Sequence, residues 1–145
     1  MYRYLALFEP CPELPGSYRV TFPDVPGAIT QGEGNADARA MAQDALEIML
    51  DDYVGEGKDL PKAKTKRGKG SYWIEPSAWA QIKLALYEEF RKARISKTEL
   101  ARRMEIAKQQ VDRLFALQHS SRIEQLESAL RAIGKMITIS VEDAA

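Results

Sequence analysis

The sequence predicts an α+β protein, in which a small sheet with one helix is followed by an all-helical part. Short apolar segments broken by Pro and Gly fill the first third of the chain, which is typical of strands. Beyond Pro76, apolar residues recur every three or four positions, which is typical of amphipathic helices. Because 145 residues suffice for two small domains, we expect one domain over residues 1–76 and another over residues 77–145.

The strands predicted near the N-terminus span residues 2–9, 17–22 and 28–32. The first is rich in aromatic and aliphatic side chains and stops at Pro10, and the second alternates apolar and polar residues. In the third strand we expect Ile29 to point inward. Turn residues separate the segments, so an antiparallel meander is expected.

A long helix is predicted after these strands, with Asn35 as its N-cap. Its apolar face consists of Ala38, Met41, Ala42, Ala45, Leu46, Met49, Leu50 and Tyr53. Such a helix can lie on one face of a small sheet. The basic segment 61–70 is predicted to be a loop, either solvated or touching DNA non-specifically, and a strand at 71–75 is expected to rejoin the sheet.

Two short helices joined by a tight turn are predicted within residues 96–134. They follow a helix over residues 78–93 whose expected core face is Trp79, Ile82, Leu86 and Phe90. Capping boxes mark two helix starts, at Ser96 with Glu99 and at Ser121 with Glu124. Apolar residues line one face of each short helix: Leu100, Ala101 and Met104, then Val111, Leu114 and Phe115. This pattern predicts a helix-turn-helix, and the alternative is a helical scaffold with solvated basic residues.

In a helix-turn-helix the second helix, here residues 108–116, enters the major groove of DNA. Gln side chains can pair with adenine and Arg with guanine. The predicted base-reading residues are Lys108, Gln109, Gln110 and Arg113. The predicted phosphate contacts are Lys97, Arg102, Arg103, His119 and Ser121. Asp112 would repel phosphate, so we expect it to orient Arg113 or to accept a hydrogen bond from a cytosine amine.

Two residues depart from the usual form of this motif. Glu105 occupies a turn position that is often Gly, and a positive φ there would cost roughly 1 kcal/mol. Ala107 replaces the Ser or Thr that usually caps the second helix, a cap worth about 1 kcal/mol. Both departures leave the fold intact but bear on DNA affinity.

Residues 136–141 alternate like a strand, although the surrounding domain is helical. An unpaired apolar strand edge is a liability, which pairing with the same strand of a second copy would remove. The predicted dimerisation residues are Met136, Ile137, Thr138, Ile139 and Val141. The alternative is that this strand pairs with the N-terminal sheet. Assembly of the homodimer into a tetramer is left open.

The net charge of zero is the sum of a negatively charged first part and a positively charged second part of the chain. Residues 1–60 hold 4 basic and 11 acidic residues, whereas residues 61–145 hold 17 basic and 10 acidic residues. A basic half suits a polyanion, because phosphate neutralisation releases counterions. An acidic half suits a basic protein partner, although a solvated surface would have the same composition.

The sequence argues against catalysis and against a metal or other cofactor. Cys11 and His119 are the only cysteine and histidine, so neither a disulfide nor a metal site is expected. The first strand offers no central carboxylate to a two-metal nuclease. We therefore expect no enzyme. No apolar stretch reaches transmembrane or signal-peptide length, so we expect a cytoplasmic protein without a membrane partner.

The sequence resembles the HicB family of antitoxins from type II toxin–antitoxin systems, in the subgroup with a helix-turn-helix. The N-terminal half carries this resemblance in SYRVTFPDVPGAITQGE and ADARAMAQDALEIMLDDY. The C-terminal half carries it in SKTELARRMEIAKQQVDRLF and LQHSSRIEQLESALRAIGKMITISVE. The DNA-binding motif alone is widespread, but its combination with the PDVPGA turn is much more specific.

The resemblance implies that the N-terminal domain is a partial ribonuclease-H-like fold without catalytic carboxylates. That domain would bind and inhibit a HicA-type toxin, a small basic ribonuclease that cleaves mRNA. The C-terminal domain would dimerise and repress its own operon at double-stranded operator DNA. Two alternatives stay open: a stand-alone transcriptional regulator with a ligand-sensing N-terminal domain, and a nuclease that depends on Asp24 or Asp51.

Overall fold

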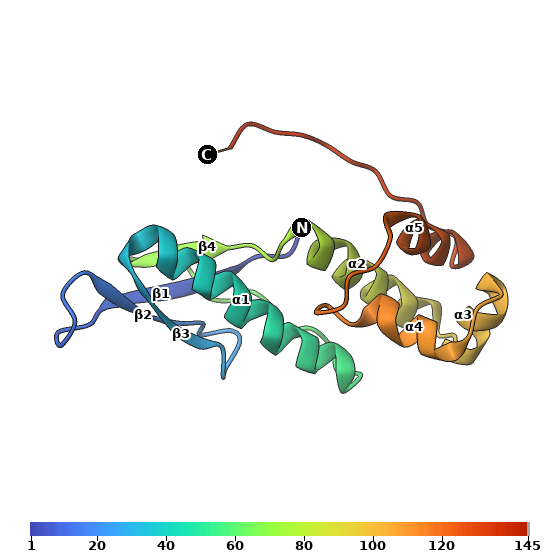
Figure 1. Cartoon of the computed structure of the whole chain (residues 1–145), viewed down its shortest axis with the longest axis horizontal. Coiled ribbons are helices and arrows are strands. Elements are labelled where there is room, and N and C mark those ends of the chain that lie inside the picture. The colour runs from blue at the N-terminus through green and yellow to red at the C-terminus, as the bar shows by residue number, and fades with distance from the viewer. Residues whose placement is uncertain (145) are drawn as a thin grey trace.

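The computed structural model describes residues 1–144, and within them the α+β prediction is confirmed. The strands are β1 (Tyr4–Pro10), β2 (Ser17–Thr21), β3 (Ile29–Glu33) and β4 (Ser71–Ile74). The helices are α1 (Gly34–Gly55), α2 (Ala78–Ala93), α3 (Lys97–Met104), α4 (Lys108–Phe115) and α5 (Ile123–Ala132). Figure 1 shows an elongated molecule, with the sheet and α1 at one end, α3 to α5 at the other and α2 between them.

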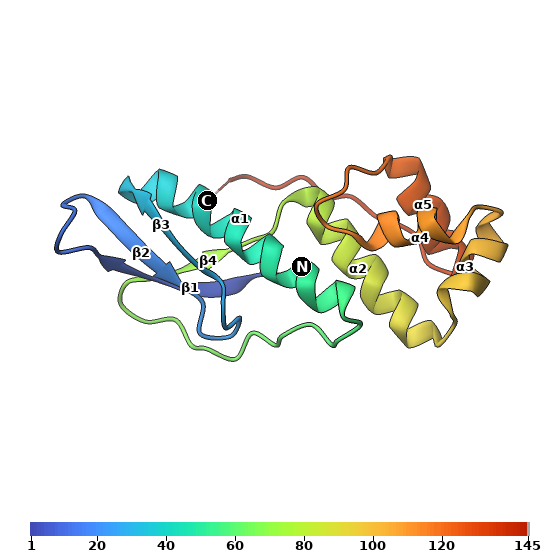
Figure 2. The ribbon, with the colours of Figure 1, turned by 60° about the horizontal axis from the view of Figure 1, so that its bottom comes forward.

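The sheet has the strand order β3-β2-β1-β4 and is antiparallel throughout. Phe8 lies opposite Val20, and Ala6 lies opposite Tyr72. The predicted meander and the return of the fourth strand to the sheet are therefore confirmed. Helix α1 runs along one face of this sheet (Figure 2).

The packing of α1 on the sheet is close and apolar. Ala38, Ala42 and Leu46 on α1 are fully buried, as the apolar periodicity predicted. The approach is closest at β3, where a Cβ added to Gly32 would lie 2.5 Å from the Cα of Ala38. A side chain at position 32 would therefore push the helix away from the sheet.

Three details of the predicted N-terminal half are wrong. Ile29 is 55% exposed, because the buried positions of this segment are Ala28 and Gly32. Met41 is 40% exposed, since it lies on the solvent side of α1. Asn35 does not cap α1, which begins one residue earlier with Glu33 as its N-cap, and instead its side chain accepts a hydrogen bond from Arg39.

Helix α2 lies between the two halves and contacts both. Ser77 caps it, with its hydroxyl accepting from the N–H of Ala80. The predicted core face is only partly correct, because Leu86 is fully buried whereas Trp79 is 40% exposed. Ala80, Lys83, Leu84 and Tyr87 are also buried, since neighbours cover α2 on two sides.

One continuous hydrophobic core extends through both halves. On the N-terminal side, the Gln81 side chain exchanges two hydrogen bonds with the backbone of Tyr2. The hydroxyl of Tyr87 donates to the carbonyl of Lys58. The domain boundary after Pro76 stays a prediction, but these contacts join α2 firmly to the residues before it.

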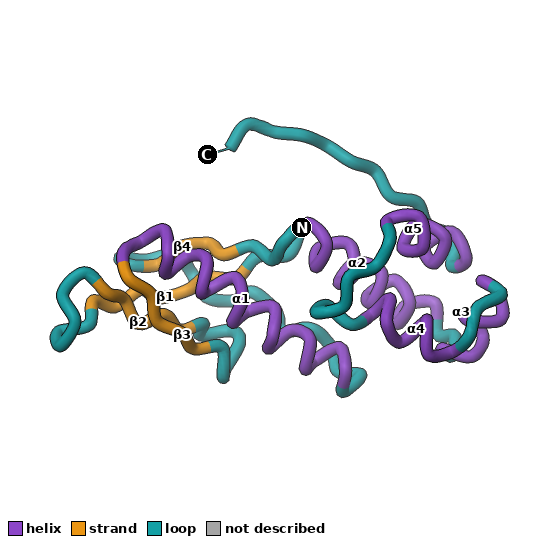
Figure 3. The backbone as a smooth tube through the Cα atoms, in the orientation of Figure 1, coloured by secondary structure: helices purple, strands orange, loops and turns teal. Residues whose placement is uncertain are grey.

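The C-terminal segment, residues 136–144, forms no strand in the part of the chain that the structure describes. Figure 3 shows it as an extended tail beyond α5. The alternative of pairing with the N-terminal sheet is wrong, because the fourth strand of that sheet is Ser71–Ile74. Met136, Ile139 and Val141 are strongly exposed, whereas Ile137 packs against the core.

Across residues 1–144, no helix is both long enough and apolar enough to cross a membrane.

Candidate functional site

Helices α3 and α4 have the boundaries and the shared core that the helix-turn-helix prediction requires. The Ser96 hydroxyl accepts from the N–H of Glu99 at 3.0 Å, which confirms the predicted cap of α3. Leu100, Val111 and Leu114 are buried between the helices, and Ile106 packs on the core from the turn. The sequence pattern therefore predicted this unit almost residue by residue.

The turn tolerates both departures from the usual motif. Glu105 has a φ of 56°, in the left-handed region, at a cost of roughly 1 kcal/mol. Ala107 begins α4 without a capping side chain, but Gln110 accepts from the backbone N–H of Ala107 at 3.0 Å. Gln110 therefore forms one of the two bonds of a capping box, and this bond holds its side chain close to the start of the helix.

The outward face of α4 is polar and accessible. Lys108, Gln109, Gln110 and Arg113 are all exposed, although the Gln110 side chain also accepts from the Ala107 N–H. Their contact with DNA bases stays a prediction. Asp112 is also exposed, but its carboxylate pairs with Lys97 at 2.8 Å. The expectation that Asp112 orients Arg113 is therefore wrong.

The predicted phosphate contacts on α3 are held by neighbouring carboxylates. Glu99 accepts from Arg102 at 2.7 Å and from Arg103 at 3.0 Å. Hydrogen bonds from these two guanidinium groups lower the pKa of Glu99 to about 2. Lys97 lies beside α4 through its pair with Asp112, whereas Arg103 also donates to the Ala132 carbonyl at the end of α5. In all three cases the paired carboxylate partly neutralises the cation.

Ser121 has to be removed from the predicted DNA contacts. Its hydroxyl is buried and accepts a hydrogen bond from Lys83 at 2.9 Å, so it faces the interior. It does not cap α5 either, because Arg122 is the N-cap and makes no side-chain cap. His119, in contrast, is exposed on the same loop and stays a predicted phosphate contact.

The buried Lys83 is the polar residue that the sequence reasoning missed. Its ammonium donates to three backbone carbonyls after and within α4 as well as to Ser121, and its residue is 0% exposed. Burial lowers the pKa of Lys83 to about 8, and the nearby Asp51 carboxylate partly opposes this shift. Its burial could have been predicted from its position in the sequence, because Lys83 lies at helical spacing from the buried residues Ala80 and Tyr87.

An acidic row lies along the exposed side of α1. It consists of Asp37, Met41, Asp44, Ile48 and Asp52, all of them exposed. Three carboxylates here alternate with two apolar side chains on one helical face. This composition suits a basic protein surface with some apolar contact area.

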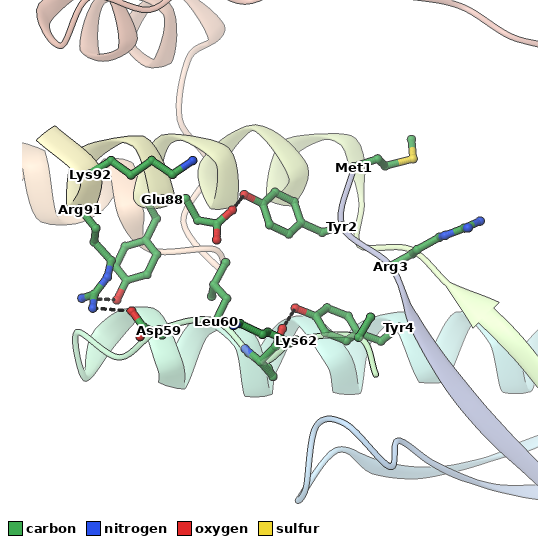
Figure 4. A pocket seen from close by; sticks show the side chains of 13 residues that line it. Met1, Tyr2, Arg3, Tyr4, Asp59, Leu60, Lys62, Glu88, Arg91 and Lys92 are labelled. Atoms are coloured by element: carbon green, nitrogen blue, oxygen red, sulfur yellow. Dashed lines mark hydrogen bonds and ion pairs between the residues drawn. The ribbon is translucent and has the colours of Figure 1, made fainter. Parts of the chain in front are cut away.

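A cavity of about 350 Å³ lies where β1, α2 and the segment before β4 meet (Figure 4). Much of its polar lining is paired internally. The hydroxyl of Tyr2 donates to Glu88, that of Tyr4 donates to the Pro61 carbonyl at 2.7 Å, and Arg91 pairs with Asp59 at 2.7 Å. The first bond joins the N-terminal segment to α2, and the other two join β1 and α2 to residues 59–61. The polar groups around the cavity therefore have a structural role at this junction.

The two aspartates that a nuclease would need have other partners. Desolvation raises the pKa of Asp24, but hydrogen bonds from Thr65 and Lys64 outweigh it and hold that pKa below its usual value. Asp24 thereby ties the basic loop to the turn after β2. Asp51 accepts from the N–H of Leu117. In residues 1–144, no group of three His, Cys, Asp or Glu side chains is placed to hold a metal ion.

Comparison with known proteins shows the same similarity over both halves. A family model described as the HicB_like antitoxin of bacterial toxin-antitoxin systems matches residues 3–85. The protein Antitoxin HicB of Escherichia coli K12 is 35% identical over 137 residues, which cover 94% of this chain and 97% of that protein.

Two further relatives cover a similar share of the chain. Antitoxin HicB 1 of Photorhabdus laumondii is 34% identical over 97% of this chain and 87% of its own length. Antitoxin HicB of Pseudomonas fluorescens is 33% identical over 91% of this chain and 90% of its own length. These similarities include the sheet with α1 as well as the helix-turn-helix. The chain therefore belongs to the HicB family of antitoxins of bacterial toxin–antitoxin systems.

Proposed function

We propose that this antitoxin inhibits a HicA-type mRNA-cleaving toxin through its N-terminal half and represses its own operon through its helix-turn-helix. One observation carries the proposal: the family match over residues 3–85 is followed in the same chain by α3 and α4, whose outward side chains suit DNA. The two activities therefore reside in different elements of one molecule. The protein acts by binding and carries out no reaction itself.

The charge of the N-terminal part supports its proposed role in toxin binding. Residues 1–60 have an excess of seven acidic residues, and the exposed row on α1 presents Asp37, Asp44 and Asp52. A small basic toxin would be attracted to this face, and Met41 and Ile48 would add apolar contact.

On the DNA side, Lys108, Gln109, Gln110 and Arg113 read base edges from α4. Lys97, Arg102, Arg103 and His119 contact phosphates beside the groove, after the carboxylates of Asp112 and Glu99 release the cations they now hold. A palindromic operator needs a twofold symmetric protein.

The symmetric protein would be a homodimer formed through the C-terminal tail. Met136, Ile139 and Val141 are exposed apolar residues in an extended segment, which would pair with the same segment of a second copy. Deletion of residues 136–145 should yield monomers in light scattering. A dimer that survives this deletion would contradict the assignment of the interface.

Native mass spectrometry of the chain purified from its own operon tests the toxin half of the proposal. We expect a small basic protein to co-purify, and that protein should arrest growth when expressed alone. Charge reversal at Asp44 and Asp52 should weaken the complex. Glu124→Lys on α5 serves as the matched control for Asp44→Lys and for Asp52→Lys taken singly, because each of the three makes the same charge change at an exposed site.

A regulator that senses a small ligand is the second candidate, and the cavity shown in Figure 4 is the observation that favours it. This candidate gains support if the chain is purified from its operon without a partner protein. It also requires that operator affinity change when a small molecule binds beside Tyr2 and Tyr4. A co-purifying toxin would leave the cavity with its structural role alone.

A further inference from the structure

The C-terminal end of α4 differs from the ends of the helices around it. Helices α2 and α3 close with left-handed residues, Arg94 at φ 53° and Glu105 at φ 56°. Helix α4 instead runs into Ala116 with φ −67° and ψ 115°, an extended conformation. Without a left-handed closing residue, carbonyl groups at the end of α4 need a donor from elsewhere.

Lys83 of α2 supplies that donor. Its ammonium lies 3.0 Å from the Arg113 carbonyl, 2.7 Å from that of Ala116 and 2.6 Å from that of His119. The Ser121 hydroxyl is a fourth acceptor at 2.9 Å. An ammonium has three N–H groups, so its hydrogen-bonding capacity is fully used. A cation at this end of a helix is also favoured by the helix dipole.

Two further side chains hold the α4–α5 loop, residues 116–122. The indole N–H of Trp79 donates to the carbonyl of Ser121 at 2.6 Å. From α1, the carboxylate of Asp51 accepts from the N–H of Leu117 at 2.8 Å. The loop is thus fixed from α1 and α2 at once, and Lys83 is the contact that reaches both the loop and α4.

We propose that Lys83 is a positioning residue for DNA recognition, which sets the orientation of α4 and of the α4–α5 loop without touching DNA. Two of its acceptors are the carbonyls of Arg113 and His119, the residues assigned to a base and to a phosphate. Loss of the ammonium would leave the Arg113 carbonyl with only the long 3.5 Å bond from the Ser121 hydroxyl and would remove the Lys83 bond to the His119 carbonyl. The end of α4 would then shift to reach water. The inference rests on the DNA-binding half of the proposed function.

The test compares Lys83→Met with Lys97→Met in the whole chain, at a temperature where circular dichroism shows both folded. Binding to operator and to random DNA is measured at several salt concentrations. We expect Lys83→Met to lower the ratio of operator to random-DNA affinity about tenfold while the salt dependence stays unchanged, since its charge is buried. Lys97→Met should instead weaken binding to both DNAs and flatten the salt dependence, because that lysine is assigned to a phosphate.

Hydrogen exchange of individual amides adds a second readout. Lys83→Met should exchange faster between residues 113 and 121, with little change in the sheet. Lys83→Gln keeps an N–H donor on a shorter side chain, so its affinity ratio should lie between those of the wild type and Lys83→Met. This variant decides the question if Lys83→Met does not fold.

The outcomes separate this inference from the proposed function. If the wild-type chain does not distinguish operator from random DNA, the DNA-binding proposal fails. If the wild type distinguishes them and the folded Lys83 variants do so equally well, the positioning role is overturned.

Discussion

Different kinds of contact stabilise the N-terminal half and the helical half of this antitoxin. The N-terminal half is stabilised by backbone pairing between strands and by close apolar packing of α1 on the sheet, as at Gly32 and Ala38. In the helical half, side chains bond to the backbone at the helix ends, as Ser96 and Lys83 do. The first half should therefore be sensitive to side-chain volume, and the second to the loss of single donors or acceptors.

The largest expected effect is a volume change in the N-terminal half. Gly32→Ala should lower the free energy of unfolding by about 3 kcal/mol, because its Cβ would overlap the backbone of Ala38. Urea denaturation measures this loss. Gly55→Ala is the matched control, since nothing lies within 4 Å of a Cβ at that position. Equal stability of the two variants would show that α1 does not pack on β3 so closely.

Arg113→Ala tests whether DNA binding and toxin neutralisation depend on different halves of the molecule. We expect it to cost about 1–3 kcal/mol of operator binding and to relax preference at one base position, because a bidentate contact to a base is lost. Toxin neutralisation, measured by rescue of growth, should be unchanged. Simultaneous loss of both activities would contradict the independence of the two halves.

A pH titration tests the buried donor in the helical half. Burial holds the pKa of Lys83 near 8, so above this pH the folded protein binds fewer protons than the unfolded chain, whose lysine keeps its ordinary value of 10.5. Stability should therefore rise by about 1 kcal/mol between pH 7 and 9 relative to Lys83→Met. Chemical denaturation at each pH measures the difference. A constant difference would mean that Lys83 is not desolvated.

The smallest effect is expected at the exposed ion pairs of α3. Glu99→Gln should release Arg102 and Arg103 for phosphate, raising DNA affinity at low salt by about twofold, because exposed pairs are weak. The slope of affinity against salt should become steeper. Glu127→Gln, which loosens the more distant Arg131 on α5, provides the comparison. Identical salt slopes for both variants would argue that α3 does not approach DNA.

The sequence was most informative where a structure depends on neighbours within one turn of helix or strand. Ser96 was identified as a cap, and the apolar faces of α3 and α4 were predicted in full. Ile29 was misplaced because an alternating pattern fits either face of a strand until the pairing register is fixed. Ser121 was also misplaced, because its spacing is that of a helix cap whereas packing against α2 buries it.

By itself, then, the sequence determined the order of the elements, the charge of each half and the side chains that α4 presents outward, because these follow from local spacing and residue type. Tertiary structure alone decided that Lys83 closes α4, that Asp51 reaches the α4–α5 loop and that residues 136–141 stay unpaired within one chain. The acceptors of Lys83 lie 30 to 38 residues away in the sequence. They converge on one ammonium only after α2, α4 and the following loop have packed together, so no local pattern could show that site.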